Sequence, residues 1–126
     1  MNRDVDPESV VARRELTLDG RDVTLLVGAA RPFADDEPDV FCPFRLEEAD
    51  GTEIWSAVAG GVDTAQAVLL ALTGAGERLA AHDGDVTFAG SHELGLPRIS
   101  TSGAGWTASF SHGLDTPDTA SASLPG

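Results

Sequence analysis

Alternating apolar and polar residues predict a β-hairpin near the start of the chain. Val10–Leu18 and Arg21–Gly28 have strand-like composition and flank Asp19-Gly20. Asp-Gly favours a two-residue type I′ turn, because both turn positions take positive φ. This turn predicts that Arg14 lies opposite Leu25, on a face that is otherwise apolar: Ala12, Leu16, Leu18, Val23, Leu25 and Val27. We interpret Arg14 as an arginine that passes along this face and extends its guanidinium beyond the sheet edge.

A second hairpin is predicted around Ala49-Asp50-Gly51, between Val40–Glu48 and residues 52–59. A two-residue turn would place Glu48 opposite Glu53, which is unfavourable for like charges. A three-residue loop with Gly51 in the left-handed region is therefore expected, and it pairs Glu48 with Thr52, Leu46 with Ile54 and Cys42 with Val58. Proline cannot donate to a strand ladder, so Pro43 predicts an edge strand or a bulge.

Residues 60–82 carry the pattern of one amphipathic helix. Asp63 is the expected N-cap, and Gln66 three residues later completes a capping box. Apolar residues then recur at helical spacing and predict the buried stripe: Val68, Leu69, Leu72, Ala75 and Leu79. A turn and a short strand over residues 86–89 follow, and Leu94 and Leu96 are expected to close the end of the core.

These elements predict an α+β fold: a four-stranded antiparallel meander of two hairpins, one helix on one face and a short fifth strand. Residues 10–99 form the single expected domain, after a flexible N-terminus at residues 1–9. Residues 100–126 are rich in Ser, Thr, Ala, Gly and Pro. Such a composition can hardly offset its ordering entropy, so a disordered or loosely docked tail is expected there.

Charge excludes several classes of partner. The formal charge is −13, with 21 Asp and Glu against 8 Lys and Arg. This field repels phosphate backbones and anionic membranes, so we expect no nucleic-acid and no membrane binding. A lone Cys42 suits a reducing compartment, and the polar first residues lack the apolar core of a secretory signal. The expected location is cytoplasmic.

The candidate reactive residues assemble no catalytic set: Cys42, Asp63, His82, His92, Glu93 and His112. A nucleophilic thiol needs a base and a lowered pKa, whereas Cys42 lies inside a strand pattern. The acidic loop around Asp35, Asp36, Glu37 and Asp39 lacks the spacing of a calcium-binding EF-hand loop. We therefore expect no catalytic residue, no metal site and no cofactor.

Four short motifs give a resemblance to a known family: RRELTLDG, CPFRL, GGVDTAQAVLLAL and LGLP. In this order they resemble an uncharacterised family of small bacterial proteins known only as a domain of unknown function. The resemblance covers about residues 11–98, and its most specific part is GVD-x-x-QA. It implies a common fold and carries over no catalytic residue.

The sequence favours a protein–protein interaction module, of an accessory or immunity-like kind, over a small-molecule or cation-binding domain. An enzyme is the third class, and the sequence leans against it. Strand alternation places a candidate interface on the sheet face away from the helix: Arg13, Leu26, Phe41, Arg45 and Trp55. Aromatic residues beside arginines are typical of interface centres. The expected partner is another protein or a second copy of this chain.

Overall fold

The first hairpin pairs in the register that its turn predicts. The computed structural model of the chain describes residues 3–102, 105–111 and 119–125, and the side chains of residues 3–97. In it, β1 (Val10–Leu18) and β2 (Arg21–Gly28) are antiparallel, and Arg14 lies opposite Leu25. Asp19 and Gly20 have φ values of 51° and 81°. Both are positive, as a type I′ turn requires.

The second hairpin has the predicted three-residue loop. It joins β4 (Val40–Glu48) to β5 (Glu53–Gly61). Gly51 has a φ of 89°, a left-handed conformation that glycine adopts without strain. The amide of Glu48 donates to the carbonyl of Thr52 at 2.8 Å, so these residues meet as predicted.

Beyond this loop the register differs from the prediction, because the ladder is irregular between Leu46 and Glu47. Leu46 lies opposite Trp55, and not opposite Ile54 as the sequence predicted. The same shift places Cys42 opposite Ala59. An extra residue in one strand moves every later side chain of that strand to the other face of the sheet. Trp55 therefore lies on the opposite face from the one predicted.

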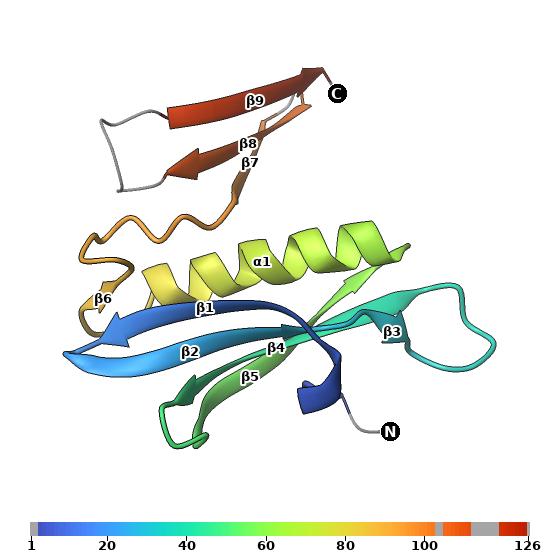
Figure 1. Ribbon diagram of the computed structural model, residues 1–126. Coiled ribbons are helices and arrows are strands. Elements are labelled where there is room, and N and C mark those ends of the chain that lie inside the picture. The colour runs from blue at the N-terminus through green and yellow to red at the C-terminus, as the bar shows by residue number, and fades with distance from the viewer. Residues whose placement is uncertain (1–2, 103–104, 112–118, 126) are drawn as a thin grey trace.

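The two hairpins join through β2 and β4 into one antiparallel sheet (Figure 1). The strand order is β6-β1-β2-β4-β5, with the short β3 (Arg31–Pro32) beside the start of β4. β6 (Val86–Thr87) pairs with the end of β1 and is the predicted fifth strand. The predicted α+β fold is therefore confirmed, with β3 as an unpredicted addition.

Pro43 lies in a central strand, so the expectation of an edge strand or a bulge at this proline is wrong. The ladder between β2 and β4 ends at Val27 opposite Phe44, and β3 pairs only with Phe41 and Val40. Pro43 thus lies between the part of β4 that pairs with β2 and the part that pairs with β3. Its missing N–H interrupts no ladder on that side, which explains how a central strand accommodates proline.

Helix α1 (Thr64–Ala80) begins at the predicted cap. Asp63 Oδ1 accepts from the amide of Gln66 at 2.8 Å, and Gln66 Oε1 accepts from the amide of Val62 at 2.8 Å. The chain turns sharply before the helix. A Cβ on Gly61 would lie only 2.6 Å from the backbone nitrogen of Ala67, so this position accepts glycine alone.

The helix packs on β4 and β5 mainly through small residues. Its buried residues are Ala67, Ala71, Ala75, Gly76 and Leu79. Val68 and Leu72 are partly buried against the core, whereas Leu69 is 37% exposed. The predicted stripe is therefore rotated towards the alanines, which allow the helix axis to approach the sheet closely. Leu94 and Leu96 pack against the same core, as predicted.

The chain ends contain more structure than their composition indicates. Val5 is buried beside Gly28, and a 3₁₀ turn, η1 (Pro7–Ser9), leads into β1. After residue 97 a separate three-stranded antiparallel sheet forms from β7 (Arg98–Ser102), β8 (Gly105–Ser111) and β9 (Thr119–Pro125).

These three strands were not predicted, because the residue types there are poor in large apolar side chains. Apolar residues nevertheless alternate with small polar ones, as in Trp106, Ala108 and Phe110, which is a strand period. Within the part of the chain that the structure describes, this sheet shares no ladder with the main sheet. That the segment is separable from the domain, and that residues 1–9 are flexible, stay predictions.

Candidate functional site

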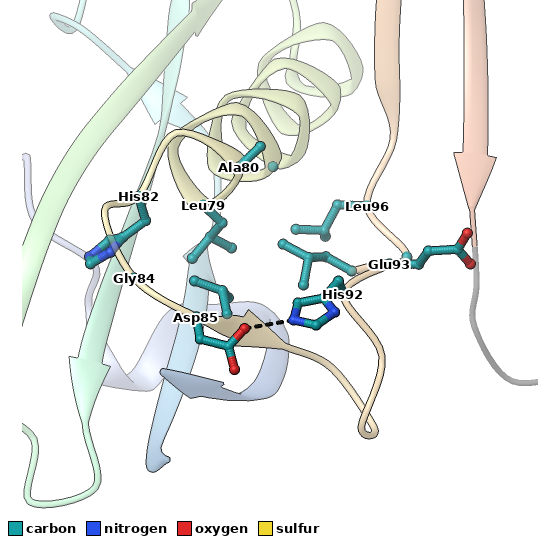
Figure 2. Close-up of a pocket in the computed structure, with 12 residues that line it drawn as sticks. Leu79, Ala80, His82, Gly84, Asp85, His92, Glu93 and Leu96 are labelled. Carbon is teal, nitrogen blue, oxygen red and sulfur yellow. Dashed lines mark hydrogen bonds and ion pairs between the residues drawn. The ribbon is translucent and has the colours of Figure 1, made fainter. Parts of the chain in front are cut away.

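A cavity of about 420 Å³ lies at the C-terminal end of α1, beside the segment that follows the helix. Figure 2 shows Leu79 of the helix facing Leu96 across it, with His92 and Asp85 at the rim. Leu79 and Leu96 are only 2% and 8% exposed. Because these walls already pack against the protein, they offer little free apolar surface to a ligand.

The polar rim of the cavity is built on the turn of the first hairpin. The amide of Asp85 donates to Asp19 Oδ1, and the amide of Asp19 donates to the Asp85 carbonyl, both at 2.8 Å. Asp85 Oδ1 in turn lies 2.6 Å from His92 Nε2. The two side chains are 66% and 77% exposed. Such an exposed pair contributes little to stability, although it orients the imidazole.

The other ionisable groups do not converge on His92. In Figure 2 the ring of His82 lies on the far side of the cavity, and Glu93 points away from it. His82 Nδ1 is buried without a hydrogen-bond partner among the described residues. The lining includes no Ser, Thr, Cys or Lys that could act as a nucleophile. His112 lies outside the described residues.

Metal binding finds no support in the same region. Across residues 3–102, 105–111 and 119–125, no three His, Cys, Asp or Glu side chains are placed to hold one metal ion. Among the described residues the geometry therefore offers an oriented imidazole, with no Ser, Thr, Cys or Lys in the cavity lining and no set of three metal ligands.

Cys42 lacks the exposure and the lowered pKa of a nucleophilic cysteine. Its side chain is fully buried, and Sγ donates to the carbonyl of Gly28 at 3.2 Å. This carbonyl lies where the β2–β4 ladder stops, so the thiol satisfies an acceptor at the gap beside Pro43. Burial raises the pKa of Cys42 from 9.0 to about 11. The thiol is therefore protonated and inert at neutral pH.

Three of the five predicted interface residues form a row across the outer face of the sheet. Arg13 lies opposite Leu26, and Leu26 lies opposite Arg45. Arg13 is paired with Glu15 at 3.1 Å. Arg45 is held by Glu47 at 3.1 Å and by its hydrogen bond to the carbonyl of Gly51 at 3.0 Å. The arginines are thus engaged within the chain.

The two aromatic residues of the predicted interface do not join this row. Phe41 is fully buried under Phe33, with ring centroids 5.1 Å apart, and the Arg31 guanidinium lies 4.9 Å from its ring. Trp55 lies on the helix side, edge-on to Phe44 at 5.9 Å and beneath Arg78. The placement of Trp55 on the outer face is therefore wrong, whereas Phe41 keeps the predicted face but is covered by Phe33.

The structure instead exposes a strand edge that the sequence analysis did not consider. Within the described part of the chain, β5 pairs with β4 alone, so one side of its nine residues has no neighbouring strand. From Ile54 to Gly61 it contains no charged residue. An unpaired row of N–H and C=O groups can accept a further strand. The sequence feature that could have indicated this edge is the uncharged run of residues 54–61.

Comparisons with known proteins place the fold in a family without giving it an activity. A search of curated proteins found no match, and a search of solved structures found none. No helix among the described residues has the length and apolar composition needed to span a bilayer. The model of the family described as "Domain of unknown function (DUF6968)" matches residues 12–98, which include both hairpins and the helix. The chain belongs to this family.

Proposed function

We propose that this domain is a protein–protein interaction module that binds its partner through the open edge of β5. The main support for this proposal is that β5 (Glu53–Gly61) pairs with β4 on one side and with no described strand on the other. An extended segment of a partner that adds to such an edge gains main-chain hydrogen bonds. Accessory and immunity-like proteins belong to this class, because their task is to hold a partner.

The distribution of charge supports β5 over the other long edge of the sheet. On that edge β1 contains Arg13, Arg14 and Glu15, and its end is covered by β6. Charged residues on an edge strand oppose pairing with another strand. The edge of β5 carries a charge only at its first residue, Glu53, although the whole chain has a formal charge of −13.

The proposal is tested with a synthetic strand as the probe. The ¹⁵N-labelled protein is titrated with a peptide that copies Glu53–Gly61, and with a control peptide that copies Val10–Leu18. The expected result is chemical-shift changes confined to β5 and to the adjoining flank of α1, with the first peptide only. Equal responses to both peptides, or changes centred elsewhere, contradict the proposal.

The cavity beside α1 supports a second candidate, a small-molecule-binding domain. Its size lies within the range of ligand pockets, and the His92–Asp85 pair provides polar contacts at the rim. A ligand with a hydrogen-bond donor or a positive charge suits this rim, because Asp85 is an acceptor there. A fragment screen by NMR tests it: shifts at Leu79, His92 and Leu96 that His92→Ala abolishes favour this candidate.

A further inference from the structure

We infer that the partner strand is β5 of a second copy of this chain, paired antiparallel across a two-fold axis. This inference rests on the proposed function of the β5 edge. An isologous contact of this kind joins the same surface patch of both subunits. Two antiparallel β5 strands would continue the sheet from one copy into the next, so that both helices lie on the same face.

The edge is suited to its own copy because it is small and neutral. The run from Ile54 to Gly61 contains Ser, Ala or Gly at five of its eight positions, and none of the eight is charged. In an antiparallel pair, residues directly opposite each other share a face and interact closely. No like charges therefore meet between the central residues of the two strands, although each chain is strongly acidic. A second copy can approach this edge without opposing charges at its centre.

Exposed apolar side chains border the edge on both faces of the sheet. Val58 on the outer face is 38% exposed, and Leu70 of α1 is 37% exposed. Leu70, Gly74 and Arg78 follow at intervals of four and so share one flank of the helix. Arg78 lies over Trp55 of β5, 5.3 Å from its ring, which places this flank on the β5 side. The two-fold pair would bury Val58 and Leu70 from both copies.

The rest of the chain leaves the edge accessible. β7 is the strand of the C-terminal sheet that contacts α1. The chain approaches β7 along the side of the helix that carries Gly76, because Gly76 faces Leu96. In Figure 1 this sheet and β5 lie on opposite sides of α1. The described residues of the C-terminal sheet therefore do not cover the β5 edge.

Charge distinguishes a second copy from a basic partner. Two copies of a chain with formal charge −13 repel each other at long range, and salt screens this repulsion. The dimer is therefore expected to tighten when NaCl is raised from about 0.05 M to about 0.5 M. A complex with a basic protein would weaken over the same range. The salt dependence thus reports which kind of partner the edge takes.

The experiment measures molar mass by light scattering coupled to size exclusion on the full-length protein. The wild type is expected to reach twice the 13.0 kDa of one chain at high concentration, and to dissociate on dilution. Val58→Lys places like charges near the axis and is expected to raise the dimer Kd at least tenfold. The matched control is Val11→Lys, at a 56% exposed position of β1, on the opposite edge of the sheet, which should leave the Kd unchanged.

A charge exchange makes the test specific for the two-fold strand pair. Val58→Glu alone should also dissociate, whereas a mixture of Val58→Lys and Val58→Glu should recover the dimer. Circular dichroism melts confirm that each variant is folded, because Val58 is exposed. A wild type that stays monomeric in high salt, a Val58→Lys variant that still dimerises, or a mixture that does not recover overturns the inference.

The outcomes separate this inference from the proposed function. If the full-length protein stays monomeric while the Glu53–Gly61 peptide still binds at β5, the edge takes a strand from a different protein. In that case the inference fails and the proposed function stands. If the peptide does not bind and the protein is monomeric, both fail.

Discussion

The guanidinium of Arg14 lies over the ring of Phe88, with 3.9 Å between its central carbon and the ring centroid. One of its nitrogens also donates to the carbonyl of Leu94 at 2.5 Å. A single cation on β1 thus contacts two points of the segment that follows α1, and Leu94 is one of the residues that line the cavity. Burial lowers the pKa of Arg14, because desolvation disfavours the charged form.

Replacing Arg14 is therefore expected to destabilise the protein through this segment. Arg14→Leu should lower the free energy of unfolding by about 1–3 kcal/mol, the combined scale of a cation–π contact and a charged hydrogen bond. Arg13→Leu is the control, since Arg13 is 62% exposed and paired only at the surface. It should cost at most about 1 kcal/mol. Urea denaturation measures both, and equal effects would refute the assigned role.

Cys42 provides a prediction for alkaline pH. A thiol that ionises at 9.0 when unfolded and at about 11 when folded keeps its proton longer in the native state. Its contribution to stability is therefore complete below pH 9 and is lost as the pH rises from 9 to 11. Cys42→Ala should remove this part of the slope of stability against pH. Identical slopes for wild type and variant would show that the thiol is not desolvated as described.

Gly61 and Gly60 form a matched pair for the turn before the helix. A Cβ on Gly61 would clash with the Ala67 backbone at 2.6 Å, whereas a Cβ on Gly60 would make an ordinary contact with the Phe33 ring at 3.5 Å. Gly61→Ala should destabilise by about 1–3 kcal/mol, as overpacking does. Gly60→Ala should change stability by less than about 1 kcal/mol. Thermal melts of both variants test the difference.

The C-terminal sheet is expected to be dispensable for folding. Among the described residues it shares no ladder with the main sheet, and β7 is its strand that contacts α1. A truncation after residue 100 should keep the Tm within about 4 °C of the full-length value. A truncation after residue 90 is the control, because it removes Leu94 and Leu96 from the core and should lower the Tm strongly. If the first truncation fails to fold, the domain boundary lies further along the chain.

The sequence predicted the elements correctly where local residues allow a single conformation. The Asp19-Gly20 turn allows a single register, and Asp63 with Gln66 determines where the helix begins. The position of Trp55 was missed because a bulge has no reliable signature in the pattern of apolar residues. One extra residue was enough to move the ring from the proposed interface to the helix side.

The cavity and the β5 edge could not be predicted for a different reason. The approach of His92 to Asp85 depends on the path of an irregular segment, which periodicity does not specify. An edge strand is defined by the strands that are absent beside it, and therefore by the whole topology. The composition of residues 54–61 indicates a strand but not its place in the sheet.

Amide hydrogen exchange along β5, measured by NMR at low and high protein concentration, tests the central claim most directly. In the dilute protein, every second amide of Glu53–Gly61 should exchange rapidly, because only the alternate amides donate to β4. At high concentration and high salt, the rapidly exchanging set should become protected as the second β5 pairs with it. If all β5 amides are protected at high dilution, or if the rapid set stays unprotected at high concentration, the edge does not bind a second copy.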